Sequence, residues 1–497
     1  MRAAFREQMV VARGALCADG GLGVLATSGE SAGQRCNSRK GGRLATALSL
    51  FVATVALAFA CVPATALAYV SSSDVVAGKP MSERDLTMAQ RLGLYAPYAC
   101  MIDNEGTIYF ERDAHLPLKI ASMTKIMTAI IALENSSPTD VVTVSHRAAT
   151  VGESTANLRE GDQLTMYNLL CCMLIPSGND AAMAVAEYIG DKALALGWDL
   201  GLEPGELVPE DPLDAFIALM NKKGRELGLE DSVFTNPHGL DEGVWAGNQH
   251  STAYDVCLMA KYAMKYDDFR SIVKLTGITI DLVRGGQTRQ LTLTSTDWFL
   301  GSYAYATGIK TGSTDLAGYC FVGSSKYLDL ELYAVVLNCE NDLDRFDDVQ
   351  DMHVWGFTHR ITYCPVNSDE TVTVHQDGYD AEYPLFAEVA HPGWISKTFK
   401  TYLSEPDTEL RLFDIDGNVT QQIIFGNLEG NIKQGQVVGQ VNFLQHNEIV
   451  CTMDIIAAED CPAPDMFQSI KIWAERVKLT FNGDATVALT RVSATVA

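Results

Sequence analysis

Hydrophobic and polar positions alternate over short stretches and recur at helical spacing over longer ones within residues 93–365. The segment 97–111 has an apolar stretch on each side of Asn104-Glu105-Gly106, which predicts a β-hairpin with its turn at these three residues. Apolar runs predict buried helical regions at Ser122–Leu133 and Leu169–Ile189. Short strands mixed with longer helices indicate an α/β (α+β) domain with an antiparallel sheet over 93–365.

A second hairpin is predicted near the end of this domain. Two apolar runs, Tyr319–Ser324 and Glu331–Leu337, flank a short turn at Leu328-Asp329. Cys320 and Cys339 lie at nearly equal distances from this turn, so the pattern predicts that they face each other across the hairpin. Both a strained cross-strand disulfide and two buried free thiols are compatible with this pattern.

Alternation with a period of two dominates beyond residue 365, which predicts a small all-β domain over residues 366–465. Its clearest strand-like runs are Thr371–Val374, Leu410–Phe413 and Val437–Phe443. Two other segments are expected to lie on the surface. Residues 69–92 read as an exposed lead-in, and Asp191–Asp211, rich in Gly, Leu and acidic residues, reads as an insertion.

The tail, residues 466–497, carries two competing patterns. Ile470, Trp473 and Val477 share a helical face with basic residues nearby, which is typical of a helix at a membrane surface. Ile470 and Ile472 also alternate, which is typical of a strand. Peripheral membrane association through the tail and a last strand of the β-domain are therefore both open.

The first 68 residues have the organisation of a secretory signal. Basic residues precede an apolar run from Leu44 to Ala60, and Ala66-Leu67-Ala68 then offers a small-residue cleavage pattern. We expect residues 1–68 to form a leader and signal peptide, with an uncleaved membrane anchor as the alternative. An exported protein would work in the cell wall or at the outer face of the cytoplasmic membrane.

The overall charge narrows the range of partners. The 497 residues include 62 acidic and 37 basic ones, a net charge of -25. This balance argues against nucleic acid as a partner, because binding phosphates needs a basic face. Hydrophobic residues make up 47% of the chain, which is ordinary for a globular protein.

Candidate chemistry begins with an S-x-x-K motif. Ser122 and Lys125 are three positions apart on a predicted helix, so the hydroxyl and the amine share one face. That spacing suits a serine nucleophile whose proton is taken by lysine. The same motif at Ser271–Lys274 shows that one match means little by itself.

Two further motifs distinguish the S-x-x-K motif at Ser122 from a chance match. Ser177-Gly178-Asn179 follows it and precedes a helix of small residues, and Lys310-Thr311-Gly312 follows at a predicted strand. S-x-x-K, S-x-N and K-T-G in this order form the signature of penicillin-recognising serine enzymes. The pair Ser271–Lys274 has no such companions.

Each residue of the triplet has an expected task. Lys125 acts as a base only when it is neutral, and burial together with the charge of Lys310 would lower its pKa. Asn179 can hold Lys125 and donate to a substrate carbonyl, and Ser177 can relay a proton to the leaving amine.

The strand that carries K-T-G is expected to form the opposite wall. Backbone N–H groups of Ser122 and Ser313 can form an oxyanion hole. Residues 308–313 can bind an extended peptide as an added strand, and Gly312 allows a close backbone approach.

The stretch Ile120–Ala129 resembles the active-site helix of the D-alanyl-D-alanine carboxypeptidases, the low-molecular-mass penicillin-binding proteins. Further segments similar to that family are 174–182, 236–240, 250–255, 308–320, 345–357 and 432–460. Arg345 matches the region where the family has an arginine near the substrate carboxylate. Two departures stand out: Thr294–Asp297 replaces an Asn-containing turn, and Thr307-Gly308 replaces the usual Asp-Gly.

The resemblance implies removal of the terminal D-alanine from peptidoglycan pentapeptide stems. Ser122 would be acylated, β-lactams would acylate the same serine as inhibitors, and no metal or organic cofactor is implied. A β-lactamase and a DD-endopeptidase are the alternative enzymes. A non-catalytic wall-binding scaffold is the alternative of another class.

Overall fold

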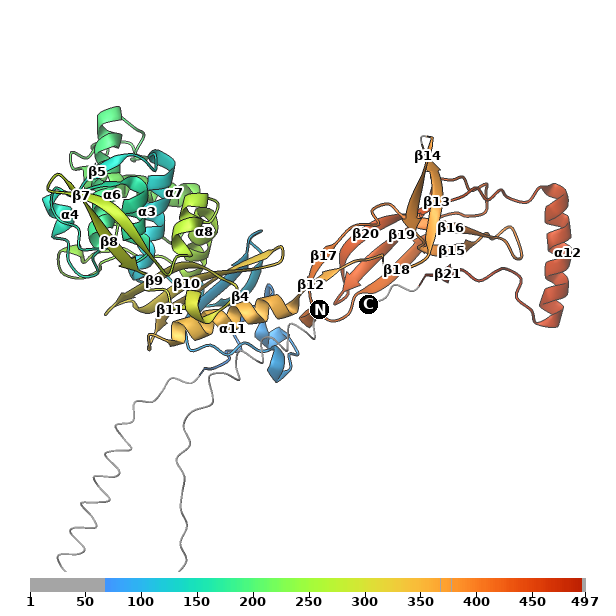
Figure 1. Ribbon diagram of the computed structural model, residues 1–497. Helices are drawn as coiled ribbons and strands as arrows, with labels where there is room; N and C mark the ends of the chain where they lie inside the picture. Colours follow the sequence, from blue (N-terminus) through green and yellow to red (C-terminus); the bar gives the residue numbers. More distant parts are fainter. Residues whose placement is uncertain (1–67, 367, 377, 494–497) are drawn as a thin grey trace, which may run out of the picture. The chain divides into compact units, whose positions relative to one another are not determined.

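The structure, a computed structural model, describes residues 68–366, 368–376 and 378–493 (Figure 1). The predicted signal peptide, residues 1–68, lies outside the described residues except for its last position. Within the described ranges, none of the helices has both the length and the hydropathy that a membrane crossing requires.

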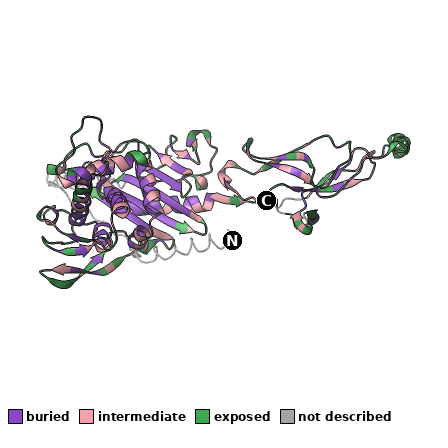
Figure 2. Ribbon diagram, turned by 90° about the horizontal axis from the view of Figure 1, so that it is seen from above, coloured by how far each residue is buried: buried purple, intermediate pink, exposed green. Residues whose placement is uncertain are grey.

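A seven-stranded antiparallel sheet forms the centre of the first domain, in the order β2-β1-β4-β3-β11-β10-β9. Its strands are β1 (Val75–Val76), β2 (Lys79–Pro80), β3 (Tyr98–Asp103), β4 (Ile108–Arg112), β9 (Ala306–Thr314), β10 (Gly318–Tyr327) and β11 (Leu330–Cys339). In β3, Cys100 and Ile102 face one hydrophobic core while Ala99 and Met101 face another. Because both faces are covered, the inner strands β3 and β11 are mostly apolar, and most of the sheet appears buried in Figure 2.

Helices cover both faces of this sheet. One face carries α3 (Lys125–Asn135), α5 (Met166–Leu174), α6 (Asn179–Leu196), α7 (Pro212–Glu226), α8 (Ala253–Ala263) and α9 (Asp267–Val273). The other face carries α11 (Asp344–His359) (Figure 1). A smaller sheet consists of β5 (Val141–Thr143), β6 (Gln163–Thr165), β7 (Gly277–Arg284) and β8 (Gln287–Thr294). The helices and antiparallel sheets, with an all-β region after them, confirm the predicted fold class.

The lead-in over residues 69–92 is not exposed as predicted. Its β1 and β2 extend the central sheet, and Val76, Leu86 and Leu92 are buried in the core next to α11. Asp74 is fully buried and forms an ion pair of 2.7 Å with Arg112 of β4. Two-residue strands are too short to leave a periodic signal, so the sequence pattern missed them.

The predicted helical regions differ from the observed helices mainly at their ends. Ser122 lies in a 3₁₀ turn, η3 (Ala121–Thr124), and the α-helix begins at Lys125. The region 169–189 is two helices, α5 and α6, separated by the turn that carries Ser177. In the insertion Asp191–Asp211, α6 continues to Leu196 and the exposed loop begins at Gly197.

The predicted cysteine geometry is wrong. The turn at Leu328-Asp329 is where it was expected, but the register that starts at Tyr327 and Leu330 would place Cys320 opposite Leu337, not opposite Cys339. A bulge then shifts the register further along and pairs Cys339 with Tyr319. Cys320 and Cys339 are both buried free thiols, so the second of the two open alternatives holds.

The C-terminal region is rich in strands, as predicted. A six-stranded sheet has the order β18-β19-β20-β16-β15-β21, and β13 (Thr371–Gln376) forms a hairpin with β14 (Tyr379–Pro384). The strands of the six-stranded sheet are β15 (Ala387–Ala390), β16 (Thr398–Leu403), β18 (Thr420–Phe425), β19 (Val437–Gln445), β20 (Glu448–Ala457) and β21 (Arg491–Val492). A third pair joins β12 (Arg360–Tyr363) to β17 (Leu410–Phe413).

The tail holds a helix and a strand. Residues Met466–Asn482 form α12, begun by a capping box at Asp465 and Gln468, and none of its residues is buried. The alternation of Ile470 and Ile472 therefore does not mark a strand. A strand of the β-domain does follow, as β21, so the tail is partly integrated into that domain.

Candidate active site

Ser122 and Lys125 meet at the junction of η3 and α3. Lys125 Nζ lies 2.8 Å from Ser122 Oγ, and the lysine side chain is fully buried. Ala121, just before the serine, has a positive φ of 48°. This unusual backbone conformation sets the start of the turn that directs the hydroxyl toward the amine.

The amine of Lys125 has three polar neighbours within hydrogen-bond distance. Besides Ser122 Oγ, its Nζ lies 2.7 Å from Asn179 Oδ1 and 2.8 Å from the carbonyl oxygen of His238. A neutral amine has two N–H donors and one lone pair. It can therefore donate to the two carbonyl-type oxygens of Asn179 and His238 and accept the proton of the Ser122 hydroxyl.

The electrostatics favour that neutral form. Burial, and then the nearby charge of Lys310, hold the pKa of Lys125 well below its usual value, while Asp180 acts in the opposite direction. A lysine that is neutral near pH 7 can serve as a general base.

The S-G-N element forms a tight turn between α5 and α6. Ser177 is in the left-handed region, with a φ of 65°, and a Cβ on Gly178 would lie 2.7 Å from the carbonyl oxygen of Cys172. Asn179 donates through Nδ2 to the carbonyl oxygen of Gly152 at 3.1 Å. Both ends of the Asn179 amide are thus occupied, so the side chain holds Lys125 in one orientation.

The K-T-G strand, β9, lies against the nucleophile turn. A Cβ on Gly312 would lie 2.8 Å from the carbonyl oxygen of Ile120 and 3.3 Å from the amide nitrogen of Ser122. Only glycine allows this close approach without a shift of the neighbouring backbone. The strand backbone at Gly312 and Ser313 is thereby brought beside the Ser122 N–H.

Lys310 supplies a buried cation on the same wall. Its side chain is 1% exposed, and its Nζ donates to the carbonyl oxygen of Thr311 at 3.0 Å. Burial and the charge of Arg345 lower the pKa of Lys310 to about 7, against the effect of Asp297.

Arg345 of α11 contacts the K-T-G strand from behind. It donates through Nη1 to the carbonyl oxygens of Gly312 and Cys320, at 2.9 and 3.0 Å, and through Nη2 to the carboxylate of Asp342. The side chain is 7% exposed, and its Nε has no hydrogen-bond partner. Arg345 thus supports the strand directly, a role that the sequence did not indicate.

Sequence reasoning missed the part of His238 and Gly239. The backbone carbonyl of His238 accepts a hydrogen bond from the Lys125 amine, whereas the His238 imidazole is buried in the interior of the domain. A Cβ on Gly239, which has a φ of 93°, would lie 1.9 Å from the carbonyl oxygen of Ala121 and 2.9 Å from the nitrogen of Ser122. The motif Asn236–Leu240 was noticed, but only the fold shows which backbone it approaches.

The second S-x-x-K motif lies apart from this cluster. Ser271 donates to the carbonyl oxygen of Asp268 and contacts the hydroxyl of Tyr167, while Lys274 is exposed at the end of α9. Among the described residues, no group of His, Cys, Asp and Glu side chains has an arrangement that could hold a metal ion.

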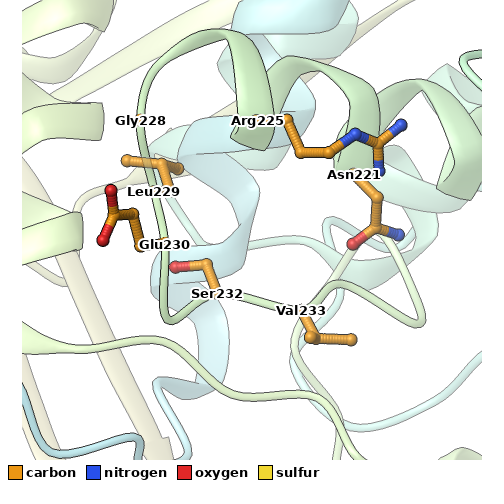
Figure 3. Close-up of a pocket in the computed structure, with 7 residues that line it drawn as sticks. All are labelled: Asn221, Arg225, Gly228, Leu229, Glu230, Ser232 and Val233. Atoms are coloured by element: carbon orange, nitrogen blue, oxygen red, sulfur yellow. The ribbon is translucent and has the colours of Figure 1, made fainter.

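A cavity of about 460 Å³ also lies apart from the candidate catalytic residues, at the C-terminal end of α7 (Figure 3). Asn221 and Ser232 line it, but their polar atoms bind Phe234 and Asp255 of the fold itself. The chemistry is therefore concentrated around Ser122.

Comparisons with known proteins agree on one family. The sequence profile described as D-alanyl-D-alanine carboxypeptidase matches residues 86–193 and 212–341. The unmatched stretch between them falls in the exposed loop after α6. The D-alanyl-D-alanine carboxypeptidase DacF of Bacillus subtilis (strain 168) is 29% identical over 387 residues, which cover 76% of this chain and 89% of the relative.

Two further similarities involve Streptomyces. A D-alanyl-D-alanine carboxypeptidase of Streptomyces sp. (strain K15) is 30% identical over 265 residues, 52% of this chain and 85% of the relative. The crystal structure of the Streptomyces K15 DD-transpeptidase has a TM-score of 0.47 and 29% sequence identity, and covers 53% of this chain and 97% of that one.

Proposed function

The chain belongs to the D-alanyl-D-alanine carboxypeptidase family, and from this premise we propose that it removes the terminal D-alanine from peptidoglycan pentapeptide stems. The observation that carries the proposal is the buried Lys125 amine, 2.8 Å from Ser122 Oγ and fixed by Asn179 and His238.

The reaction proceeds through an acyl-serine intermediate. Ser122 Oγ attacks the carbonyl carbon of the penultimate D-alanine while its proton passes to Lys125 Nζ. The C–N bond then breaks, and the leaving amine takes a proton from the Ser177 hydroxyl, which is replenished from Lys125. Water next attacks the ester, the proton returns to Ser122 Oγ, and the shortened stem leaves as a carboxylate.

The oxyanion of both tetrahedral intermediates is stabilised by backbone donors. We assign this role to the N–H groups of Ser122 and Ser313, because Gly312 brings the two backbone segments within contact distance. A β-lactam carbonyl fits the same place, so penicillins acylate Ser122 as inhibitors.

The substrate carboxylate is bound by the K-T-G wall. Lys310 supplies the positive charge and the Thr311 hydroxyl a hydrogen-bond donor. Arg345 adds a second cation, since its guanidinium lies behind Gly312. A positive wall favours a free terminal carboxylate over a cross-linked stem, and thus a carboxypeptidase over an endopeptidase.

Incubation with a peptide that ends in D-Ala-D-Ala tests this function. We expect release of free D-alanine, and a penicillin should form a lasting acyl-enzyme. Rapid turnover of the penicillin without such an adduct would favour a β-lactamase, and cleavage of cross-linked dimers alone would favour an endopeptidase. A protein that neither releases D-alanine nor binds penicillin would be a wall-binding scaffold.

Export and membrane contact complete the proposal. An enzyme that cleaves peptidoglycan stems acts outside the cytoplasm, in agreement with the signal pattern of residues 1–68.

The helix α12 exposes the large apolar side chains Met466, Phe467, Ile470, Trp473 and Phe481. We propose that this face associates with the outer surface of the cytoplasmic membrane.

Sedimentation with phosphatidylglycerol vesicles measures this association. Trp473 is 68% exposed, and Trp473→Glu should reduce the bound fraction several-fold because it places a charge on the apolar face. Tyr379→Glu, at a side chain that is 66% exposed in the β-domain, is the matched control and should bind like the parent protein. Equal binding of all three proteins would rule out this face as the contact.

A further inference from the structure

A buried carboxylate that the reaction scheme does not use lies between β8 and α10 (Phe299–Ser302). Asp297 is 7% exposed, and its Oδ1 accepts a hydrogen bond from the Phe299 amide at 3.0 Å. Its Oδ2 is buried without any hydrogen-bond partner. Burying a carboxylate oxygen without a partner is unfavourable unless an opposite charge compensates it.

The segment that carries Asp297 is fastened to the active-site walls. The Thr296 hydroxyl lies 2.7 Å from the hydroxyl of Thr311, the residue after Lys310. The Thr296 amide donates to the carbonyl oxygen of Ile175, two positions before Ser177, at 3.3 Å. The segment that carries Asp297 is therefore anchored, through Thr296, both to the K-T-G strand and to the end of α5 just before the S-G-N turn.

The protonated form of Lys310 requires a nearby negative charge to stabilise it. Within the described part of the chain, the Lys310 amine has one hydrogen-bond acceptor, the carbonyl oxygen of Thr311, and two cations disfavour its positive charge. Arg345 disfavours the charged form of Lys310, and Lys310 and Lys125 repel each other when both are protonated. Asp297 is the acid that raises the pKa of Lys310.

We propose that Asp297 is a positioning residue whose buried negative charge keeps Lys310 protonated beside the neutral Lys125. This inference rests on the proposed function, because it assigns the charges on which acylation depends. Burial raises the pKa of Asp297 to about 7, and the charge of Lys310 acts in the opposite direction and favours the ionised carboxylate.

Other ionisable groups near β9 leave this assignment intact. The turn η3 and the helix α10 carry none. On β10, Cys320 is a buried thiol, and Tyr319, Lys326 and Tyr327 are at least partly exposed. The buried Asp241 accepts a hydrogen bond from the Thr314 hydroxyl at 2.7 Å, at the far end of β9 from Lys310. Helix α9 carries Asp267, Asp268 and Arg270, and Arg270 is paired with Glu331. Burial raises the pKa of Cys320 to about 11, so this thiol stays neutral over the relevant range.

The test compares pH profiles of penicillin acylation for the parent protein and for Asp297→Asn. Acylation should rise with pH as Lys125 loses its proton and fall as Lys310 loses its own. Loss of the Asp297 charge should move the falling limb to lower pH by about one unit, which makes acylation about tenfold slower on that limb. The rising limb reports the pKa of Lys125. It should change less, because Asp297 acts on Lys310 directly and on Lys125 only through Lys310.

Asp348→Asn is the matched control. Asp348 is also buried, has a pKa raised to about 7 by burial, and accepts hydrogen bonds from backbone N–H groups, but it lies on α11 and binds Tyr95 and Ala96. This variant should lose stability without moving the falling limb. A merely structural role of Asp297 would give the two variants the same profile.

The outcomes are separable. An unshifted falling limb in Asp297→Asn overturns the inference while leaving the proposed function intact. A parent protein that is not acylated at any pH instead overturns the proposed function. Where the asparagine variant does not fold, the smaller variant Asp297→Ser, which also removes the charge, decides: a falling limb at lower pH supports the inference, and a limb like that of the parent overturns it.

Discussion

Replacement of Ser122 by alanine is expected to abolish penicillin acylation and to reduce D-alanine release by about 10⁴-fold or more. The variant removes the only atom that can form the ester, while Lys125 keeps its contacts with Asn179 and His238. Release of D-alanine with time and mass spectrometry of the intact protein measure the two effects.

Ser271→Ala is the matched control for this prediction. Ser271 stands in the same S-x-x-K spacing, but its hydroxyl contacts Tyr167 and the backbone of Asp268. We expect unchanged acylation and release. Activity that survives in Ser122→Ala and disappears in Ser271→Ala would show that the wrong motif has been assigned.

Gly239→Ala should have the second largest effect, although residue 239 does not touch the substrate. The new methyl carbon would lie 1.9 Å from the carbonyl oxygen of Ala121 and 2.9 Å from the nitrogen of Ser122, so the nucleophile turn has to move. A displacement of about 1 Å at the reacting atoms costs roughly 100-fold in rate. Penicillin acylation rates and thermal unfolding measure the loss of activity and of stability.

Gly435→Ala separates this steric effect from backbone strain. Gly435 has a similar φ of 80°, but a Cβ there meets nothing within 4 Å. The left-handed conformation alone should cost about 1–2 kcal/mol and leave acylation unchanged. If Gly239→Ala behaved like Gly435→Ala in both measurements, the proposed contact with the nucleophile turn would be wrong.

Much of the catalytic core could be predicted because its signals are local. The spacing of Ser122 and Lys125 places both on one turn whatever the rest of the chain does, and the two strands that follow the K-T-G motif have apolar patterns of their own. The hairpin at Asn104-Glu105-Gly106 was predictable for the same reason.

The features that were missed depend on contacts between distant segments. Gly239 matters because its backbone meets Ala121, and Asp297 because it is buried beside Lys310. The two short strands near Asp74 gain their order from pairing with β4, not from their own sequence. A pattern within a window of 10 or 20 residues contains none of this information.

The bulge in the β10–β11 hairpin shows a different limit. The turn was located correctly, but β11 has one extra residue between Val336 and Cys339, opposite the stretch from Tyr319 to Phe321, and Cys339 therefore pairs with Tyr319. A bulge leaves alternation almost unaltered at its ends, so cross-strand partners beyond it cannot be counted from the turn.

The central claim is that the hydroxyl of Ser122, activated by a neutral Lys125, forms the covalent intermediate. Peptide mapping by mass spectrometry after brief exposure to penicillin tests it most directly. We predict a penicilloyl adduct on the peptide that contains Ser122, at the serine itself. An adduct on Ser177, on Ser271 or on no residue at all would contradict the account.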